Sequence, residues 1–234
     1  MNSREQNRAL NSAEYSSQAT VLRSMPVRAW LAFTGRCNLN CAHCPRRSYA
    51  EGIQVGPDMS EKVFEKVMEK ILPFLYDCKV GGNNLGEQLL AKEWNGFRQK
   101  LEENEFTRCL VTNGVLLTSE RAEKLIKGGW ILDISVEGAT AETYKKIRNV
   151  EFGRFIDMVT ECCRIKNSEV KTESRIRLCF TAFYDNIEEL PLLVKLAGEM
   201  GVDEVMVTHL IPLRESQRNQ SLVYHKGLYN KIRA

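Results

Sequence analysis

Short apolar and β-branched runs alternate with longer segments of helical period from residue 26 to about residue 210. Such runs are typical of strands. The predicted strands are VRAWLAF (27–33), CKVGG (78–82), TRCLVTN (107–113), ILDISVE (131–137), RIRLCFTAF (175–183) and DEVMVTHL (203–210). Each is followed or preceded by a candidate helix, so the pattern is that of repeated βα units.

The helical segments carry recognisable end signals. They span residues 60–75, 91–104, 119–129, 142–147, 152–167 and 186–201. Ser60 is placed to cap the first, and Gly128-Gly129 ends the third. Parallel neighbours need long connections, so six strands joined by helices predict a largely parallel α/β sheet.

The fourth and fifth predicted strands have one polar face each. The period of two places Asp133, Ser135 and Glu137 on one side of the fourth strand. On the fifth strand, Arg177, Cys179 and Thr181 share a side. Because helices cover the apolar side, these polar faces are predicted to line the interior of a barrel. Arg177 then needs an anionic partner, either a ligand carboxylate or the acid row of the fourth strand.

Composition places the chain among ordinary globular proteins. Its 234 residues are 43% hydrophobic and 27% charged, with a net charge of +3. We expect one main domain at residues 26–212, no nucleic-acid partner, no membrane segment and a cytoplasmic location. Residues 1–25 are polar and without apolar periodicity, which predicts a mobile arm, with a substrate-covering role as an alternative. Residues 213–234 form a polar tail, expected to be either the start of a further helix near Ser221 or a truncated extension.

Three of the eight cysteines are clustered and five are scattered. A cytosolic chain keeps its thiols reduced, so the even count does not indicate disulfides. The scattered residues are expected to pack in the core as small hydrophobes, and they are Cys78, Cys109, Cys162, Cys163 and Cys179.

The clustered cysteines follow the first strand in the segment TGRCNLNCAHCP. Cys37, Cys41 and Cys44 have the spacing Cys-x3-Cys-x2-Cys, which suits one ion or one cluster. A closed zinc site needs four ligands, whereas three thiolates leave one iron of a [4Fe-4S] cube open to a small molecule. Zinc with His43 as the fourth ligand is the alternative.

On these residues the chain resembles the radical S-adenosylmethionine (SAM) superfamily, over roughly residues 26–212. The family signature, Cys-x3-Cys-x-aromatic-Cys, corresponds to Cys37, Cys41, His43 and Cys44. The resemblance implies a partial six-stranded (β/α) parallel barrel in which the three cysteines hold a [4Fe-4S] cluster. SAM chelates the fourth iron, and reductive cleavage yields a 5′-deoxyadenosyl radical. It also implies that His43 lies beside the adenine.

Further segments match the same family. Gly86-Glu87-Gln88 stands where the family has Gly-Glu-Pro, which contacts the amino group of SAM; Gln88 replaces the proline and removes a fixed φ. Ser135 and Glu137 stand where the family binds the ribose, and Arg177 lies on a strand whose polar residues often hold SAM. Asn113-Gly114 matches the family's TNG turn, for which a mainly structural role is expected.

The resemblance implies an enzyme that abstracts hydrogen from a peptide or another biosynthetic intermediate. A radical SAM dehydrogenase or epimerase of a small metabolite is the second hypothesis, and a zinc-stabilised binding module without turnover is the third. An electron donor such as flavodoxin or ferredoxin is implied as a partner. The fourth-strand region is closest to members that often carry a cysteine-rich extension of the SPASM or twitch type, and no cysteine follows Cys179 here.

Overall fold

The structure, a computed structural model, describes residues 3–44, 46, 56–82, 86–169 and 172–225. The chain forms two compact units. The first comprises Met1–Arg36 and Gly56–Val111, and the second comprises Cys37–Val55 and Thr112–Ala234. The two units are described separately below, and the predicted domain 26–212 includes parts of both.

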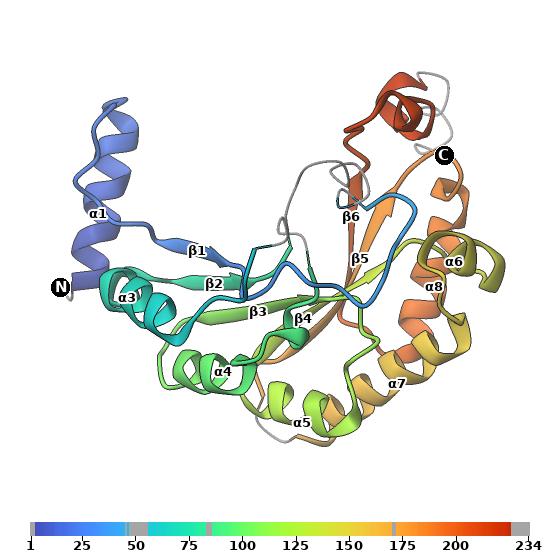
Figure 1. The fold of residues 1–234 in the computed structure, drawn as a ribbon, viewed down its shortest axis with the longest axis horizontal. Helices are drawn as coiled ribbons and strands as arrows, with labels where there is room; N and C mark the ends of the chain where they lie inside the picture. The colour runs from blue at the N-terminus through green and yellow to red at the C-terminus, as the bar shows by residue number, and fades with distance from the viewer. Residues whose placement is uncertain (1–2, 45, 47–55, 83–85, 170–171, 226–234) are drawn as a thin grey trace. The chain divides into compact units, whose positions relative to one another are not determined.

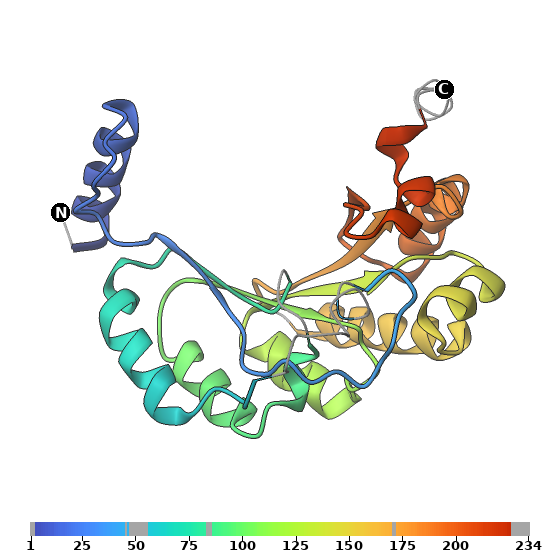
Figure 2. The same cartoon turned by 45° about the horizontal axis from the view of Figure 1, so that its top comes forward.

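The first unit contains three parallel strands in the order β1-β2-β3. Helices α3 and α4 run along one side of them (Figure 2). Its elements are α1 (Ser3–Ser16), β1 (Arg28–Leu31), α3 (Glu61–Ile71), η1 (Leu72–Phe74), β2 (Asp77–Val80), η2 (Gln88–Leu90), α4 (Trp94–Glu102) and β3 (Thr107–Thr112), whose last residue belongs to the second unit. Ser60 caps α3 as predicted, accepting a hydrogen bond from the Val63 amide.

An aromatic cluster forms the core of this unit. The Phe97 ring lies 4.4 Å from that of Phe64 and 4.8 Å from that of Phe33, and Trp94 packs against Phe33 at 6.0 Å. All four side chains are buried, and complete burial of a Phe side chain contributes about 1.5–3 kcal/mol. Phe33 lies just after β1, so the cluster fixes the backbone that leads into the cysteine segment.

Residues 3–16, part of the segment expected to be a mobile arm, form helix α1. The Arg4 guanidinium donates to the Glu105 carbonyl at 2.6 Å and lies over the Tyr76 ring. Asn7 exchanges two hydrogen bonds with the Met25 backbone. Polar and cation–π contacts therefore dock this helix, which explains why apolar periodicity did not reveal it.

The second unit contains three more parallel strands in the order β4-β5-β6. Helices α6, α7 and α8 lie on one side of β5 and β6 (Figure 1). Its elements are α5 (Ser119–Lys127), β4 (Trp130–Val136), α6 (Ala141–Arg148), α7 (Phe152–Ser168), β5 (Arg175–Ala182), η3 (Ile187–Glu189), α8 (Leu190–Met200), β6 (Glu204–His209), η4 (Glu215–Gln220) and η5 (Leu222–Tyr224).

Apolar and polar side chains alternate along β4, as predicted. Leu132, Ile134 and Val136 are fully buried in the core of the unit. On β5, Cys179 is only half-buried, whereas the other four scattered cysteines are buried. The expectation of core packing is therefore wrong for Cys179, which shares its strand face with Arg177 and Thr181.

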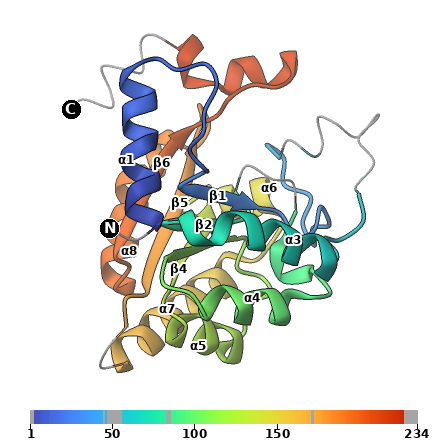
Figure 3. The same cartoon turned by 90° about the vertical axis from the view of Figure 1, so that its left-hand side faces the viewer.

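The predicted fold class is confirmed. Six parallel strands alternate with helices in an α/β fold, and in the described part of the chain the strands do not close into a barrel. Beyond β6, the tail forms two 3-10 helices, with only the single turn η5 at the place where a helix was expected near Ser221. Figure 3 shows these turns, in red, beyond the end of β6. No helix in the described ranges is both long and apolar enough to cross a membrane.

Candidate cysteine-loop site

The cysteine loop, residues 37–44, belongs to the second unit. Cys41 is buried, Cys37 and Cys44 are half-buried, and all three are free thiols. The Cys44 amide donates to the Cys41 carbonyl at 3.1 Å, which closes a turn. The Ala42 amide donates to the Ile147 carbonyl at 2.9 Å, so the loop is tied to the last turn of α6.

Asn113, at the end of β3, directs its amide toward the first cysteine. Its Nδ2 lies 2.9 Å from Asn38 Oδ1 and 3.9 Å from Cys37 Sγ. Its Oδ1 accepts from the Val115 amide at 2.9 Å, which orients the side chain. The Leu39 amide is a second donor to Cys37 Sγ, at 3.5 Å. Two N–H groups are therefore directed at Cys37 Sγ, so Asn113 does more than form the predicted turn.

The turn after Asn113 favours glycine, because its backbone lies in the left-handed region. Gly114 has φ +82°, and a Cβ there would lie 2.4 Å from Cε of Met158. The asparagine followed by glycine at a strand end was the available signal for this residue, but a strand-ending turn has the same appearance in sequence.

A buried ion pair lies beside the loop. Arg148 Nε donates to Glu137 Oε2, and their side chains are only 6% and 2% exposed. Burial raises the pKa of the Cys41 thiol, and the positive charge of Arg148 opposes that rise. Glu137, predicted to bind ribose, is therefore engaged by Arg148, a residue that the sequence did not single out.

His43 lies near the second carboxylate oxygen of Glu137, the one that Arg148 Nε does not contact. Its Nε2 is 3.7 Å from Glu137 Oε1, and its ring centroid is 6.0 Å from that of Phe183. Burial lowers the pKa of His43, an effect that Glu137 partly offsets, so the ring is neutral near pH 7. The approach is too long for a hydrogen bond and is not an ion pair. The tail also reaches this point, since Gln217 Nε2 donates to the His43 carbonyl at 3.4 Å.

The polar faces of β4 and β5 are paired in register. Asp133 lies opposite Arg177, and Ser135 lies opposite Cys179. The Arg177 guanidinium contacts Asp133 at 2.6 Å and Glu204 of β6 at 3.9 Å. Two partners were possible for Arg177, a ligand carboxylate or an acid of the fourth strand. The structure contains the second, since Asp133 lies on β4.

The Gly86-Glu87-Gln88 segment belongs to the first unit, and residues 83–85 before it lie outside the described part of the chain. Gly86 has φ +135°, and a Cβ would lie 2.4 Å from the Thr34 carbonyl oxygen, so only glycine fits. The Glu87 amide donates to the Arg36 carbonyl at 2.7 Å. The Glu87 carboxylate is buried and caps η2 through the Leu89 amide.

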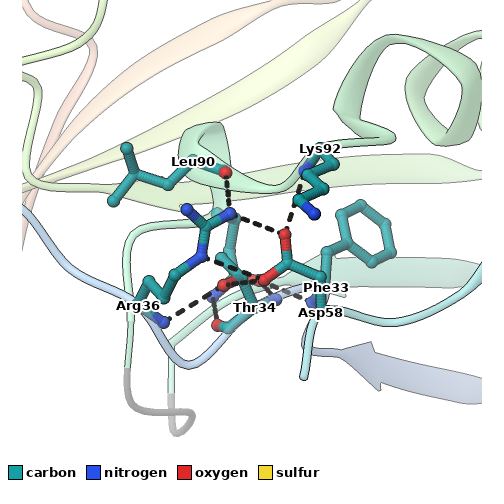
Figure 4. Close-up of polar contacts among 7 residues, drawn as sticks. Phe33, Thr34, Arg36, Asp58, Leu90 and Lys92 are labelled. Atoms are coloured by element: carbon teal, nitrogen blue, oxygen red, sulfur yellow. Dashed lines mark hydrogen bonds and ion pairs between the residues drawn. The ribbon is translucent and has the colours of Figure 1, made fainter. Parts of the chain in front are cut away.

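The segment just before the cysteine loop is held by an ion-pair network (Figure 4). Asp58 accepts from Thr34 Oγ1 at 2.7 Å, from the Lys92 amide at 3.1 Å and from the Arg36 guanidinium at 2.6 Å. Arg36 also donates to the Leu90 carbonyl. Hydrogen bonding by Arg36 lowers the pKa of Asp58 well below its usual range.

The donor set of the loop suits an iron–sulfur cluster. Across the described ranges, no three His, Cys, Asp or Glu side chains are grouped so as to hold one metal ion. A closed zinc site requires four ligands around one ion. Cluster ligands need no such convergence, because each thiolate binds a different iron. Three thiols on one loop, with N–H donors at Cys37, therefore fit a cluster better than zinc.

Comparisons with known proteins agree on one family. The profile described as "Radical SAM superfamily" matches residues 31–176, more than half of the chain. The tungsten-containing aldehyde ferredoxin oxidoreductase cofactor-modifying protein of Pyrococcus furiosus is 23% identical over 87% of this chain and 61% of its own length. The AdoMet-dependent heme synthase of Methanosarcina barkeri is 29% identical over 79% of this chain and 50% of its own length. The chain thus spans about half the length of these curated relatives.

Solved structures share the fold. Streptococcus suis SuiB bound to S-adenosylmethionine superposes with a TM-score of 0.71 at 16% identity, covering 98% of this chain and 51% of SuiB. SuiB bound to the precursor peptide SuiA superposes with a TM-score of 0.69 at 15% identity and the same coverage. At such low identity these likenesses concern the fold alone.

Proposed function

Because this chain belongs to the radical SAM superfamily, we propose that it cleaves SAM reductively and uses the resulting radical to abstract hydrogen from a peptide or another biosynthetic intermediate. Members of the family use a [4Fe-4S] cluster and SAM. The observation that carries the proposal is the position of three free thiols, Cys37, Cys41 and Cys44, on the loop after β1, inside the matched range.

The cysteine loop is the proposed binding site for the cluster. When bound, the cluster supplies the electron that breaks the sulfonium bond of SAM and releases a 5′-deoxyadenosyl radical. Asn113 and the Leu39 amide donate toward Cys37 Sγ and fix its position in the loop. The positive charge of Arg148 favours ionisation of Cys41, which burial alone would suppress. The chain's part is to hold three deprotonated sulfurs in place.

Individual residues are proposed to contact SAM. Glu87 is proposed to bind its amino group, with Gly86 allowing close backbone approach. His43, neutral and beside Phe183, is proposed to lie against the adenine. Ser135 is the better candidate for the ribose, because Glu137 is engaged by Arg148. Arg177 is engaged by Asp133 and Glu204, which supports a role in ordering the strand faces.

A peptide is the substrate class that we favour. The fold is shared with SuiB, whose structure was solved with a precursor peptide. A small-metabolite dehydrogenase or epimerase is the second candidate, favoured by the match to a heme synthase, whose product is not a peptide. A precursor-peptide gene beside the gene for this chain would support the first candidate. Flavodoxin or ferredoxin is the proposed electron donor.

The decisive experiment is anaerobic reconstitution with iron and sulfide, followed by SAM and dithionite. We expect four irons per chain, as a [4Fe-4S] cluster requires, and release of 5′-deoxyadenosine. Cys37→Ala should abolish the release, and Cys163→Ala, which removes a buried thiol of α7, should retain it. Stoichiometric zinc without iron, or release that survives Cys37→Ala, would overturn the proposal.

A further inference from the structure

Gln88 is a fully buried amide whose three hydrogen bonds all go to the backbone just after β1. Its Oε1 accepts from the Phe33 amide at 2.6 Å and from the Thr34 amide at 3.3 Å. Its Nε2 donates to the Thr34 carbonyl at 3.1 Å. The side chain thus pairs with residues 33–34 as a neighbouring strand would, supplying both an acceptor and a donor.

The backbone on either side of Gln88 follows the same segment. Gly86 packs against the Thr34 and Arg36 carbonyls, closely enough to exclude any Cβ. The Glu87 amide donates to the Arg36 carbonyl. Residues 86–88 therefore contact residues 33–36 along their whole length, and Gln88 supplies the buried end of this contact.

Both ends of residues 33–36 are anchored independently. The Phe33 side chain lies in the aromatic cluster of the first unit. Thr34 and Arg36 are hydrogen-bonded to Asp58, as Figure 4 shows. The segment is thus a rigid support, and the Glu87 loop is fastened to it through the Gln88 amide.

We propose that Gln88 is a positioning residue for SAM binding, because its amide locks the loop that carries Glu87 to the rigid segment preceding Cys37. The inference rests on the proposed function, in which Glu87 binds the amino group of SAM. Proline in this position would restrict the loop through a fixed φ. Here a side-chain clamp restricts it instead, so loss of the amide frees the Glu87 backbone without removing the carboxylate.

The variant that tests the clamp is Gln88→Met, which keeps the length of the side chain and removes all three hydrogen bonds. Gln99→Met on the exposed face of α4 is the matched control. We expect the Kd of the reconstituted protein for SAM to rise at least about tenfold in Gln88→Met, and KM for SAM to rise with it. The kcat per loaded cluster should change less, because the group that binds SAM is displaced and not deleted.

Amide hydrogen exchange measures the clamp without reference to the cluster. Phe33 and Thr34 should lose protection in Gln88→Met and keep it in Gln99→Met. If Gln88→Met proves insoluble, Gln88→Asn is measured in the same way, since its amide is one methylene too short to make the same bonds. It should show the same loss of protection and the same rise in Kd.

The outcomes separate the inference from the proposed function. A wild-type protein that takes up no iron and releases no 5′-deoxyadenosine overturns both. An active wild-type protein whose Gln88→Met variant binds SAM within twofold of the wild type overturns the positioning role alone. A lowered melting temperature with an unchanged Kd also overturns it, because that result assigns Gln88 to stability only.

Discussion

Two charged pairs, one in each unit, differ in their exposure to solvent. In the first unit, Arg36 pairs with Asp58, and their side chains are 47% and 14% exposed, so the pair is open to solvent on the Arg36 side. In the second unit, Arg148 pairs with Glu137, and their side chains are 6% and 2% exposed. The first pair supports the segment before Cys37, and the second lies beside Cys41 and His43.

The difference in exposure predicts different energetic roles. A half-exposed pair is screened by water and salt, so its net contribution is small. A buried pair contributes little beyond what apolar residues would provide, but breaking it leaves an uncompensated charge. The first pair therefore adds little stability to a segment that Phe33 and Gln88 already hold in place. In the second pair, removal of only one of the two residues is expected to destabilise the unit strongly.

The largest effect is expected from Arg148→Met. Glu137 would remain buried without its partner, and we expect the free energy of unfolding to fall by about 3–5 kcal/mol. Urea denaturation of the chain without a cluster measures this loss. Arg154→Met, on the exposed face of α7, is the matched control and should change stability by less than about 0.5 kcal/mol.

Removing both charges sharpens the comparison. In Arg148→Met with Glu137→Gln, no buried charge remains, and we expect more than half of the lost stability to return. Cys41 would then lose the positive charge of Arg148, which lowers its pKa, together with the smaller opposite effect of Glu137, so reconstitution should still yield less iron per chain. A double variant as unstable as Arg148→Met would contradict the assignment of the cost to an unpaired Glu137.

A smaller effect is expected from Asn113→Leu. It removes the amide between Asn38 and Val115, which is also one of the two donors to Cys37 Sγ, at a cost of about 1–2 kcal/mol. Hydrogen bonds to cluster sulfurs raise the reduction potential, so the potential should become more negative in an EPR-monitored titration. Asn95→Leu, on the exposed face of α4, is the control and should leave the potential unchanged. An unchanged potential would show that the 3.9 Å contact does not act on the cluster.

The sequence predicted the framework and the ligands better than the contacts between them. All six strands and the alternating faces of β4 follow from local periodicity, as does the cap at Ser60. The pairing of Glu137 with Arg148 does not, because Arg148 follows two lysines in α6 and resembles a solvated residue. In sequence, Gln88 indicates only the absence of the proline that the family has at this position.

Those residues have a common physical reason for escaping prediction. Their partners lie on other elements, 55 residues away for Gln88 and Phe33 and 11 residues away for Arg148 and Glu137. Helical and strand periods report which face is buried, but not which atom a buried polar group meets. Helix α1 was missed for the related reason that its docking contacts are polar.

The smallest effect is expected from Asp58→Asn, which removes the charge of the half-exposed pair while keeping the size of the side chain. We expect the melting temperature at pH 7 to fall by about 2–4 °C. Because the folded protein lowers the pKa of Asp58, the stabilisation is complete above the ordinary aspartate pKa of about 4 and is lost progressively as pH falls below it. The difference between wild type and variant should therefore shrink from pH 7 to pH 3, and it should also shrink at high salt, since the Arg36 side chain is half-exposed. A difference that persists undiminished in both conditions would mean that Asp58 acts as a buried charge, and the contrast with Glu137 would fail.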